Sequence, residues 1–373
     1  MSEPAYFPYR AQKNRPYIAE FLTLPDKERR WDVLTQMALF GTRRAFGDRE
    51  SINADSGLSR LVHACCMHES WLSSGLADFF NGGQVVFHIT PTLRDAFATS
   101  DLGDATVRDL KFPFRDSYIH LGYDTGLVFN GGRTKLEGVL LSEKTHKDGV
   151  SVSVTLVGSL IETPAHWGHR GMESFTFHFS QAEMDMPILE GATRYLAAQG
   201  VDPATSKDFA DLSQFDEEAR KSILDSWDAQ TEERNLHVDN IPVVLECVRL
   251  VANALLYVSQ YPDDMADDFQ EGFPQAFREK IELAEGKNLQ RILSKARNNG
   301  FTLIKKVGGV FERAMQVEAA AQGGSGDSPA PHLRRAHWRR QAFGAGLTQR
   351  KLIWIRAARV LGGTTRDKPY LVN

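Results

Sequence analysis

The sequence predicts an α+β fold in which an antiparallel sheet of about four to six strands is covered by helices and followed by a small basic module. Three observations lead to this prediction. Between residues 117 and 180, several runs alternate apolar and polar side chains with a period of two, as strands with one buried face do. The regions before and after these runs space their apolar residues at helical intervals. Finally, the composition becomes strongly basic after residue 330.

Length and composition are those of a globular protein. The chain has 373 residues, 42% of them hydrophobic and 25% charged, which suits two ordinary domains or one large one. Met1 to Arg15 lacks the apolar core of a signal peptide, and polar side chains interrupt the longest apolar stretch, Ile241 to Val258, so we predict no membrane span. The sparse cysteines fit a reducing cytoplasm; they are Cys65, Cys66 and Cys247.

The first 110 residues are predicted to form a helical N-terminal region. Asp26 to Phe46 and Leu58 to Phe80 place apolar residues at helical spacing, and two glycines end the second helix. A short strand is expected at Gln84 to Ile89. Thr90-Pro91 then provides a helix start signal, with threonine before the first turn and proline at its first position.

Residues 111–321 are predicted to form an α+β body, with strands between 117 and 180 and helices between 187 and 321. Glycine-containing turns separate the expected strands, which are Ser117 to Phe129, Thr134 to Ser142, Ser151 to Ile161 and Glu173 to Phe179. Helices are expected at Ile241 to Gln260, Pro274 to Lys280, Leu289 to Ala296 and Val310 to Ala321.

The helix Ile241 to Gln260 should cover the sheet. Its apolar residues fill one face, and Glu246, Arg249 and Asn253 share a polar stripe. The acidic pairs Asp263-Asp264 and Asp267-Asp268 follow this helix, and we expect them in a solvated loop.

Charge is divided unevenly along the chain. Val201 to Gln290 holds 20 acidic and 8 basic residues, whereas Arg291 to Asn373 holds 16 basic and 4 acidic ones. A Gly/Ser-rich stretch at 322–330 is predicted to be a flexible linker, and it is followed by a small basic C-terminal module, residues 331–373. The basic end either binds an acidic partner such as nucleic acid or docks on the acidic part of its own chain.

The module contains the candidate partner-binding residues. Arginine binds phosphate through two parallel hydrogen bonds, and tryptophan and histidine rings stack on bases. Trp338 and Trp354 also suit the core of a small two-stranded unit, which is the alternative role for them. The full set of candidates is His332, Arg334, Arg335, His337, Trp338, Arg339, Arg340, Lys351, Trp354 and Arg356.

No catalytic, metal or cofactor site is predicted. The sequence has no Gly-Lys-Ser/Thr phosphate loop, no Gly-x-Ser-x-Gly elbow and no His-Glu-x-x-His motif. Asn130-Gly131-Gly132 and Val307-Gly308-Gly309 are interpreted as turns, because they lack the lysine or the strand–helix frame of a phosphate site.

Histidines leave one enzymatic alternative open. His332 and His337 are five residues apart, which is not the spacing of a helical zinc site, and neither cysteines nor carboxylates support a site at His166 and His169. Two histidines beside Arg335 could nevertheless act as acid and base in metal-independent RNA cleavage. We favour a non-enzymatic binding protein.

The C-terminal segment resembles a known family. Pro331-His332-Leu333-Arg334-Arg335-Ala336-His337-Trp338, a glycine turn, then Lys351-Leu352-Ile353-Trp354-Ile355 and Val360 are similar to the terminal signature of anti-CRISPR proteins that lower effector expression in type V-A systems. Phe112 to Leu121 and Leu255 to Asp264 resemble the family more loosely. Ala336 stands where the family has glycine, and Ala357 and Ala358 stand where it tends to have proline.

The resemblance implies an inhibitor of bacterial immunity from a phage or plasmid, acting in the cytoplasm of a bacterial host. It implies binding to a nascent CRISPR effector polypeptide, or another host protein, and loss of the effector mRNA. The basic module would then lie near mRNA or the ribosome. No membrane partner and no small-molecule cofactor are implied.

Overall fold

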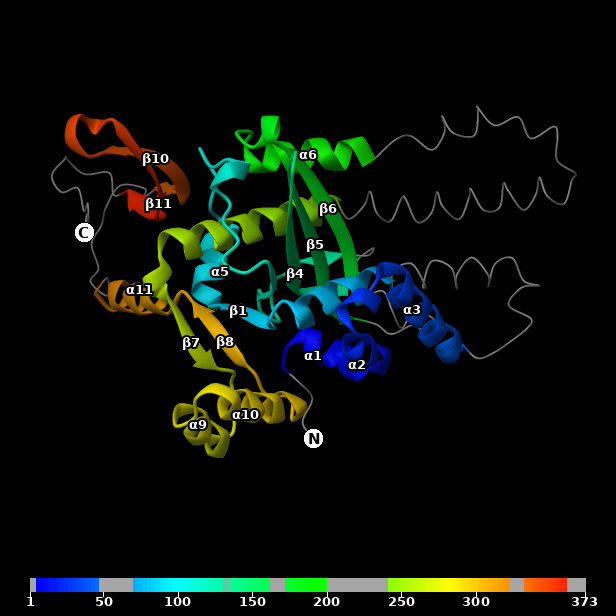
Figure 1. Cartoon of the computed structure of the whole chain (residues 1–373). Helices are drawn as coiled ribbons and strands as arrows, with labels where there is room; N and C mark the ends of the chain where they lie inside the picture. The colour runs from blue at the N-terminus through cyan, green and yellow to red at the C-terminus, as the bar shows by residue number, and fades with distance from the viewer. Residues whose placement is uncertain are drawn as a thin grey trace, which may run out of the picture.

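The computed structural model describes residues 5–46, 70–129, 132, 134–161, 172–199, 241–321 and 332–360. The fold class predicted from the sequence, α+β with a helical N-terminal region, is confirmed (Figure 1). The predicted linker 322–330 and the first part of the acidic stretch, residues 201–240, lie outside the described residues, as do Cys65, Cys66, His166 and His169.

Within the described residues the main sheet has eight strands, in the order β6-β5-β4-β2-β1-β8-β7, with β3 paired to β4. Their bounds are β1 (Val85–Ile89), β2 (Asp116–His120), β3 (Val128–Phe129), β4 (Thr134–His146), β5 (Gly149–Leu160), β6 (Met172–Ser180), β7 (Met265–Phe269) and β8 (Leu303–Val307). The run β6-β5-β4-β2 is antiparallel, as predicted. The sheet as a whole is mixed, because β1 runs parallel to both β2 and β8.

Two strands lie where the sequence predicted none, so the sheet is larger than expected. The pair Asp267-Asp268 belongs to β7, an edge strand, where one side of the strand is solvated and acidic residues are tolerated. Asp267 pairs with Lys305 of β8 at 2.5 Å. Asp264 instead caps α11 (Gly309–Ala321), since its carboxylate accepts the backbone N–H groups of Val310 and Phe311. The prediction of a solvated loop was therefore wrong for Asp264, Asp267 and Asp268.

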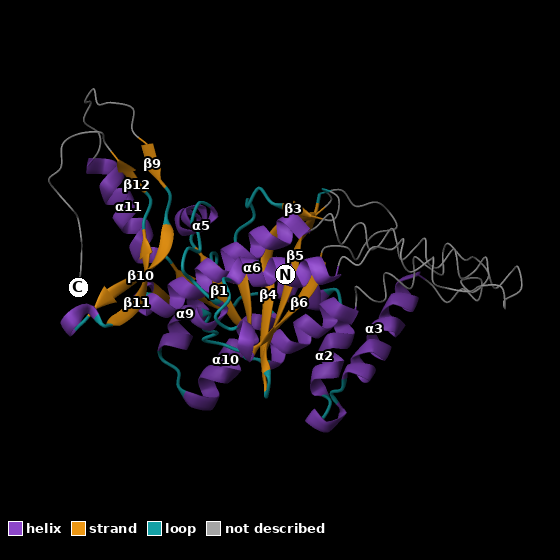
Figure 2. Cartoon of the chain, turned by 90° about the horizontal axis from the view of Figure 1, so that it is seen from above, coloured by secondary structure: helices purple, strands orange, loops and turns teal. Residues whose placement is uncertain are grey.

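Helices cover both faces of the sheet. One core contains Val86, Tyr118 and Leu140, which face α1 (Phe7–Lys13), α2 (Pro16–Thr23) and the helical residues 70–81. The other core contains the neighbouring residues of the same strands. It is covered by α5 (Pro91–Ala98), α6 (Ile188–Gln199) and the helix Ile241–Gln260. Alternate strand residues thus enter opposite cores, which makes the sheet the middle layer (Figure 2).

The remaining helices lie at the edges. They are α3 (Trp31–Phe46), α9 (Gln275–Glu282), α10 (Gly286–Asn298) and α11 (Gly309–Ala321). Of the described helices, Ile241–Gln260 has the length and hydropathy to cross a bilayer, but it is largely buried. Val244, Cys247 and Leu256 of this helix are 0% exposed within the protein core, which accounts for its apolar composition.

A buried polar cluster lies under α1, on the strands β1 and β2. His88 and His120 are register partners, and their ring centroids are 5.2 Å apart. The Tyr6 hydroxyl bonds to Nδ1 of His88 at 3.0 Å, and the Tyr118 hydroxyl to Nδ1 of His120 at 3.3 Å. Burial lowers the pKa of His120 to about 3, and that of His88 is lowered by the same cause. Both imidazoles are therefore neutral near pH 7.

Candidate nucleic-acid interface

The basic module forms two small antiparallel strand pairs. β10 (His337–Phe343) and β11 (Gln349–Ile355) make a hairpin around a turn at Ala345–Leu347, in which Trp338 lies directly opposite Trp354. β9 (His332–Arg334) pairs with β12 (Ala358–Val360). The hairpin lies at one end of the molecule, away from α2 and α3 (Figures 1 and 2).

Both tryptophans of the hairpin enter the main hydrophobic core. Trp338 is 1% and Trp354 7% exposed, and their ring centroids are 6.5 Å apart. The Trp338 indole N–H donates to Oδ1 of Asn253 at 2.8 Å, and the Trp354 indole N–H donates to the Ser100 hydroxyl at 3.2 Å. Each indole thus buries its ring and satisfies its single polar group.

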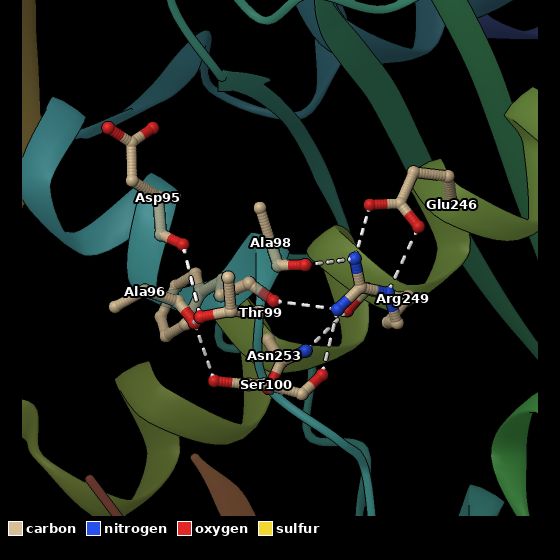
Figure 3. Close-up of polar contacts among 9 residues, drawn as sticks. Asp95, Ala96, Ala98, Thr99, Ser100, Glu246, Arg249 and Asn253 are labelled. Carbon is tan, nitrogen blue, oxygen red and sulfur yellow. Dashed lines mark hydrogen bonds and ion pairs between the residues drawn. The ribbon is translucent and has the colours of Figure 1, made fainter. Parts of the chain in front are cut away.

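The polar stripe of the helix Ile241–Gln260 holds this hairpin in place. Asn253 donates through Nδ2 to the Arg249 carbonyl at 2.9 Å while accepting from Trp338. The Arg249 guanidinium bonds to the carbonyls of Phe97 at 3.0 Å, of Ser100 at 2.8 Å and of Ala98, and it pairs with Glu246 (Figure 3).

Arg249 therefore caps the C-terminal end of α5, where unpaired carbonyls and the helix dipole favour a cation. It also fixes Ser100, which is the acceptor for Trp354.

The loop after α5 adds a backbone connection to the hairpin. The Asp101 N–H donates to the Ala336 carbonyl at 2.8 Å, and the Trp338 N–H donates to the Asp101 carbonyl at 3.1 Å. Gly103 has a φ of +52°, and a Cβ placed on it would lie 2.1 Å from the Trp338 carbonyl oxygen. Glycine is required there, because the two backbones approach too closely for a side chain.

Two arginines of the module form ion pairs with the body. Arg340 contacts Asp109 at 2.5 Å, and its backbone N–H donates to Asp104 at 3.2 Å. Arg356 lies 3.7 Å from Glu318 and 5.3 Å from the centre of the Phe311 ring. These two carboxylates lie outside the acidic stretch 201–290, so the ion pairs that Arg340 and Arg356 form within the described residues are with other side chains of the body.

Four other cations point to solvent. Arg335 precedes β10, Arg339 and Lys351 share the outer face of the hairpin, and Arg350 lies near its tip. Among the described residues none of them forms an ion pair, although Arg339 donates to Gln341 at 2.8 Å. Arg335, Arg339, Arg350 and Lys351 are called the hairpin cations below. At the tip, Phe343 is 42% and Leu347 63% exposed.

Burial corrects part of the predicted binding set. Trp338 and Trp354 offer no face on which a base could stack, and the alternative, that they form the core of a two-stranded unit, is what the structure has. Arg340 and Arg356 are engaged with the body. The side chains of His332 and Arg334 lie outside the described residues. Contact through Arg335, His337, Arg339 and Lys351 stays a prediction, and Arg350 joins them because it is exposed.

No catalytic geometry appears at the described end of the module. His337 is half-buried, and its Nδ1 lies 3.3 Å from the Arg335 carbonyl. Within the described residues no three His, Cys, Asp or Glu side chains are grouped as metal ligands.

Gly308 and Gly309 lie where a strand is followed by a helix, which the sequence did not predict. Gly308, with φ of +95°, joins β8 to α11, so a strand–helix frame does exist here. Asp264 fills the anion position at the α11 N-terminus, so these backbone N–H groups are not available to a phosphate.

Local patterns in the sequence indicated only some of the residues that hold the hairpin. Glu246, Arg249 and Asn253 were recognised as one polar stripe, but their partners lie far away along the chain. Ala336, which replaces a family glycine, is 1% exposed and is not among the described residues with positive φ. Alanine therefore fits this position without backbone strain.

Comparison with known proteins gives one family. The model of the AcrVA2-like family, described as the anti-CRISPR type V subtype A2 family, matches residues 87–362. This match begins within β1 and includes the other strands of the sheet, the helix Ile241–Gln260 and the hairpin. A crystal structure of AcrVA2 aligns with a TM-score of 0.38 and 11% identity, covering 94% of this chain and 92% of that chain. No curated protein matches the chain.

Proposed function

The chain belongs to the AcrVA2-like, anti-CRISPR type V subtype A2 family, and from this premise we propose that it binds a CRISPR effector polypeptide during synthesis and promotes loss of the effector mRNA. In this proposal the hairpin cations contact RNA near the ribosome, in the cytoplasm of a bacterial host. The body binds protein, the hairpin binds RNA, and no cofactor takes part.

The observation behind the RNA contact is that the hairpin buries its tryptophans and exposes its cations. Trp338 and Trp354 fix the inner side in the core, while Arg335, Arg339, Arg350 and Lys351 stay exposed without a carboxylate partner among the described residues. Pro329 to Thr365 contains no acidic residue, so nothing in that segment repels phosphate. A rigid support with exposed arginines suits a phosphate backbone.

Docking of the tail on its own body is compatible with this proposal. A purely structural role is the alternative for the tail, and its tryptophans do pack into the core. Docking uses Trp338 and Trp354, however, and leaves the hairpin cations exposed. A structural role alone therefore gives no reason for these side chains to be basic.

A pair of reporters tests the proposed function. Both would carry the 5′ region of a type V-A effector gene with nearly identical RNA, and one would encode a different N-terminal peptide through compensating frameshifts. Co-expression of the full chain should lower the mRNA only of the reporter that encodes the effector peptide. Equal loss of both mRNAs, or loss of neither, would contradict recognition through the polypeptide.

A second arm tests the RNA contact in the same assay. Arg339/Arg350/Lys351→Glu reverses three hairpin cations, and Lys13/Lys27/Lys147→Glu reverses three exposed lysines elsewhere that have no ion pair among the described residues. Only the hairpin variant should keep reporter mRNA high. If the two variants lowered reporter mRNA equally, the hairpin cations would have no part in the mechanism.

A further inference from the structure

A second surface lies on the helical pair α9–α10, beyond the strands β7 and β8 and away from the hairpin (Figure 1). A groove of about 330 Å³ opens between these two helices. Ala276 and Phe277 of α9 and Ile292 of α10 give it an apolar lining. Lys280, Arg291 and Lys295 stand on its rim.

The rim is cationic and largely without partners. Lys280 and Lys295 form no ion pair among the described residues, and Arg291 donates only to the Asn288 side chain, at 3.1 Å. Helix α10 carries four basic residues and no acidic one. The carboxylates of α9, Glu279 and Glu282, do not line the groove. The groove therefore presents an uncompensated positive rim around an apolar floor.

Aromatic contacts hold α9 against the neighbouring strands. Phe273 is 4% exposed and contacts the rings of Phe269, Phe277 and Phe301 at centroid distances of 4.8 to 6.4 Å. Arg278 lies 5.0 Å from the centre of the Phe269 ring and donates to the Phe273 carbonyl. A partner would therefore meet a preformed groove, which lowers the entropy lost on binding.

We propose that this groove binds a peptide segment in which a large apolar side chain is flanked by carboxylates. The apolar side chain would lie on Phe277 and Ile292, and the carboxylates would pair with Lys280, Arg291 and Lys295. Grooves between two helices commonly take peptides through such apolar anchors. Charge complementarity selects an acidic segment over a neutral or basic one.

A peptide fits this groove better than RNA. Base recognition on a single strand needs exposed aromatic faces, whereas Phe277, the aromatic ring of the lining, is half-buried and packs against Phe273. Leu283, in the turn joining the two helices, is 87% exposed and adds apolar surface to the same pair. An apolar floor with a cationic rim matches a side chain and its acidic neighbours.

This inference rests on the proposed function only for the identity of the partner, since it names the chemistry of the polypeptide that the body binds. Its test uses neither effector nor mRNA, so the two proposals can fail separately. The probe is a fluorescein-labelled peptide with a central leucine between glutamates, and its anisotropy is measured with the full chain. Two control peptides replace the leucine by alanine or the glutamates by glutamines.

The leucine–glutamate peptide should bind, and either control peptide should bind at least about tenfold more weakly. Lys280→Glu/Lys295→Glu should weaken binding by at least about tenfold as well, whereas Lys27→Glu/Lys147→Glu should leave it unchanged. Lys280→Arg/Lys295→Arg should retain it, and equal melting temperatures would show that all variants are folded.

Three results would overturn the proposal. The first is no binding of the leucine–glutamate peptide up to about 1 mM. The second is binding that Lys280→Glu/Lys295→Glu does not change. The third is that the groove binds something else. This would be shown if binding of an oligonucleotide of equal charge depended on Lys280 and Lys295 more than peptide binding does, or if the chain self-associated and these substitutions abolished the self-association.

Discussion

The indole N–H of Trp338 donates to the Oδ1 of Asn253 across a buried contact of 2.8 Å. This bond joins the C-terminal hairpin to the central helix Ile241–Gln260, although the two residues lie 85 positions apart in the sequence. It turns a basic tail into a fixed part of the fold. The hairpin cations are consequently displayed in one defined arrangement.

Removing the acceptor of this bond should destabilise the protein. Asn253→Ala leaves the Trp338 N–H buried without a partner, so the free energy of unfolding should fall by about 1–3 kcal/mol. Urea denaturation followed by tryptophan fluorescence measures this. Asn298→Ala, at an exposed position of α10, is the control and should change stability little. Equal stability of the two variants would show that the bond contributes nothing.

The close approach at Gly103 gives a second prediction. Gly103→Ala requires a Cβ 2.1 Å from the Trp338 carbonyl oxygen, so the hairpin must shift, and we expect a loss of about 2 kcal/mol or more. Gly272 also has a positive φ, of +74°, but its Cβ would meet no atom within 4 Å. Gly272→Ala therefore measures the backbone strain alone. The contact is unimportant if both alanine variants lose the same stability.

Trp354 should contribute more to the free energy of unfolding than an exposed tryptophan does. Trp354→Ala leaves a cavity beside Phe97, Tyr257 and Phe311, whose rings lie 5.5 to 5.7 Å from the indole, and about 3–5 kcal/mol should be lost. Trp31 is 51% exposed, and Trp31→Ala is the matched control. Calorimetry should give a clearly lower melting temperature for Trp354→Ala, and similar melting of both variants would argue against a docked hairpin.

Stability should fall in acid because of His120. Its pKa is lowered in the folded protein to about 3, against about 6.5 when unfolded, so the unfolded chain binds the extra proton between these values. The free energy of unfolding should therefore decrease as the pH falls from about 6.5 toward 3, by up to about 1.4 kcal/mol per pH unit for one proton. Urea denaturation at several pH values measures this slope.

His120→Gln isolates the contribution of this imidazole, because glutamine keeps a hydrogen-bonding side chain that does not titrate. The stability of the variant should depend less steeply on pH than that of the native protein. Parallel curves for the two proteins would assign the acid sensitivity to other groups.

Local patterns in the sequence predicted the elements that have strong periodicity. The antiparallel strands β4, β5 and β6 and the helix Ile241–Gln260 agree with their predicted positions within a few residues. The short edge strand β7 was missed, because Asp267 and Asp268 resemble a solvated loop when the neighbouring strand is unknown.

The sequence predicted which residues make up the candidate interface, but not which of their side chains face the core and which face solvent. The basic residues and both tryptophans were identified from the sequence, and alternation in β11 allowed either a buried or a stacking Trp354. The choice depends on Asn253 and Ser100, which meet the two indoles only in the folded chain. Long-range hydrogen bonds of this kind leave no local pattern in the sequence.

The most direct test of the central claim is RNA binding by the purified full chain as a function of salt. Arg339/Arg350/Lys351→Glu should weaken binding by at least about tenfold and flatten the dependence of affinity on salt, with an unchanged melting temperature. The control Lys13/Lys27/Lys147→Glu should bind nearly as the native protein does. If the hairpin variant binds RNA with native affinity and native salt dependence, the hairpin cations are not the RNA contact and this account is contradicted.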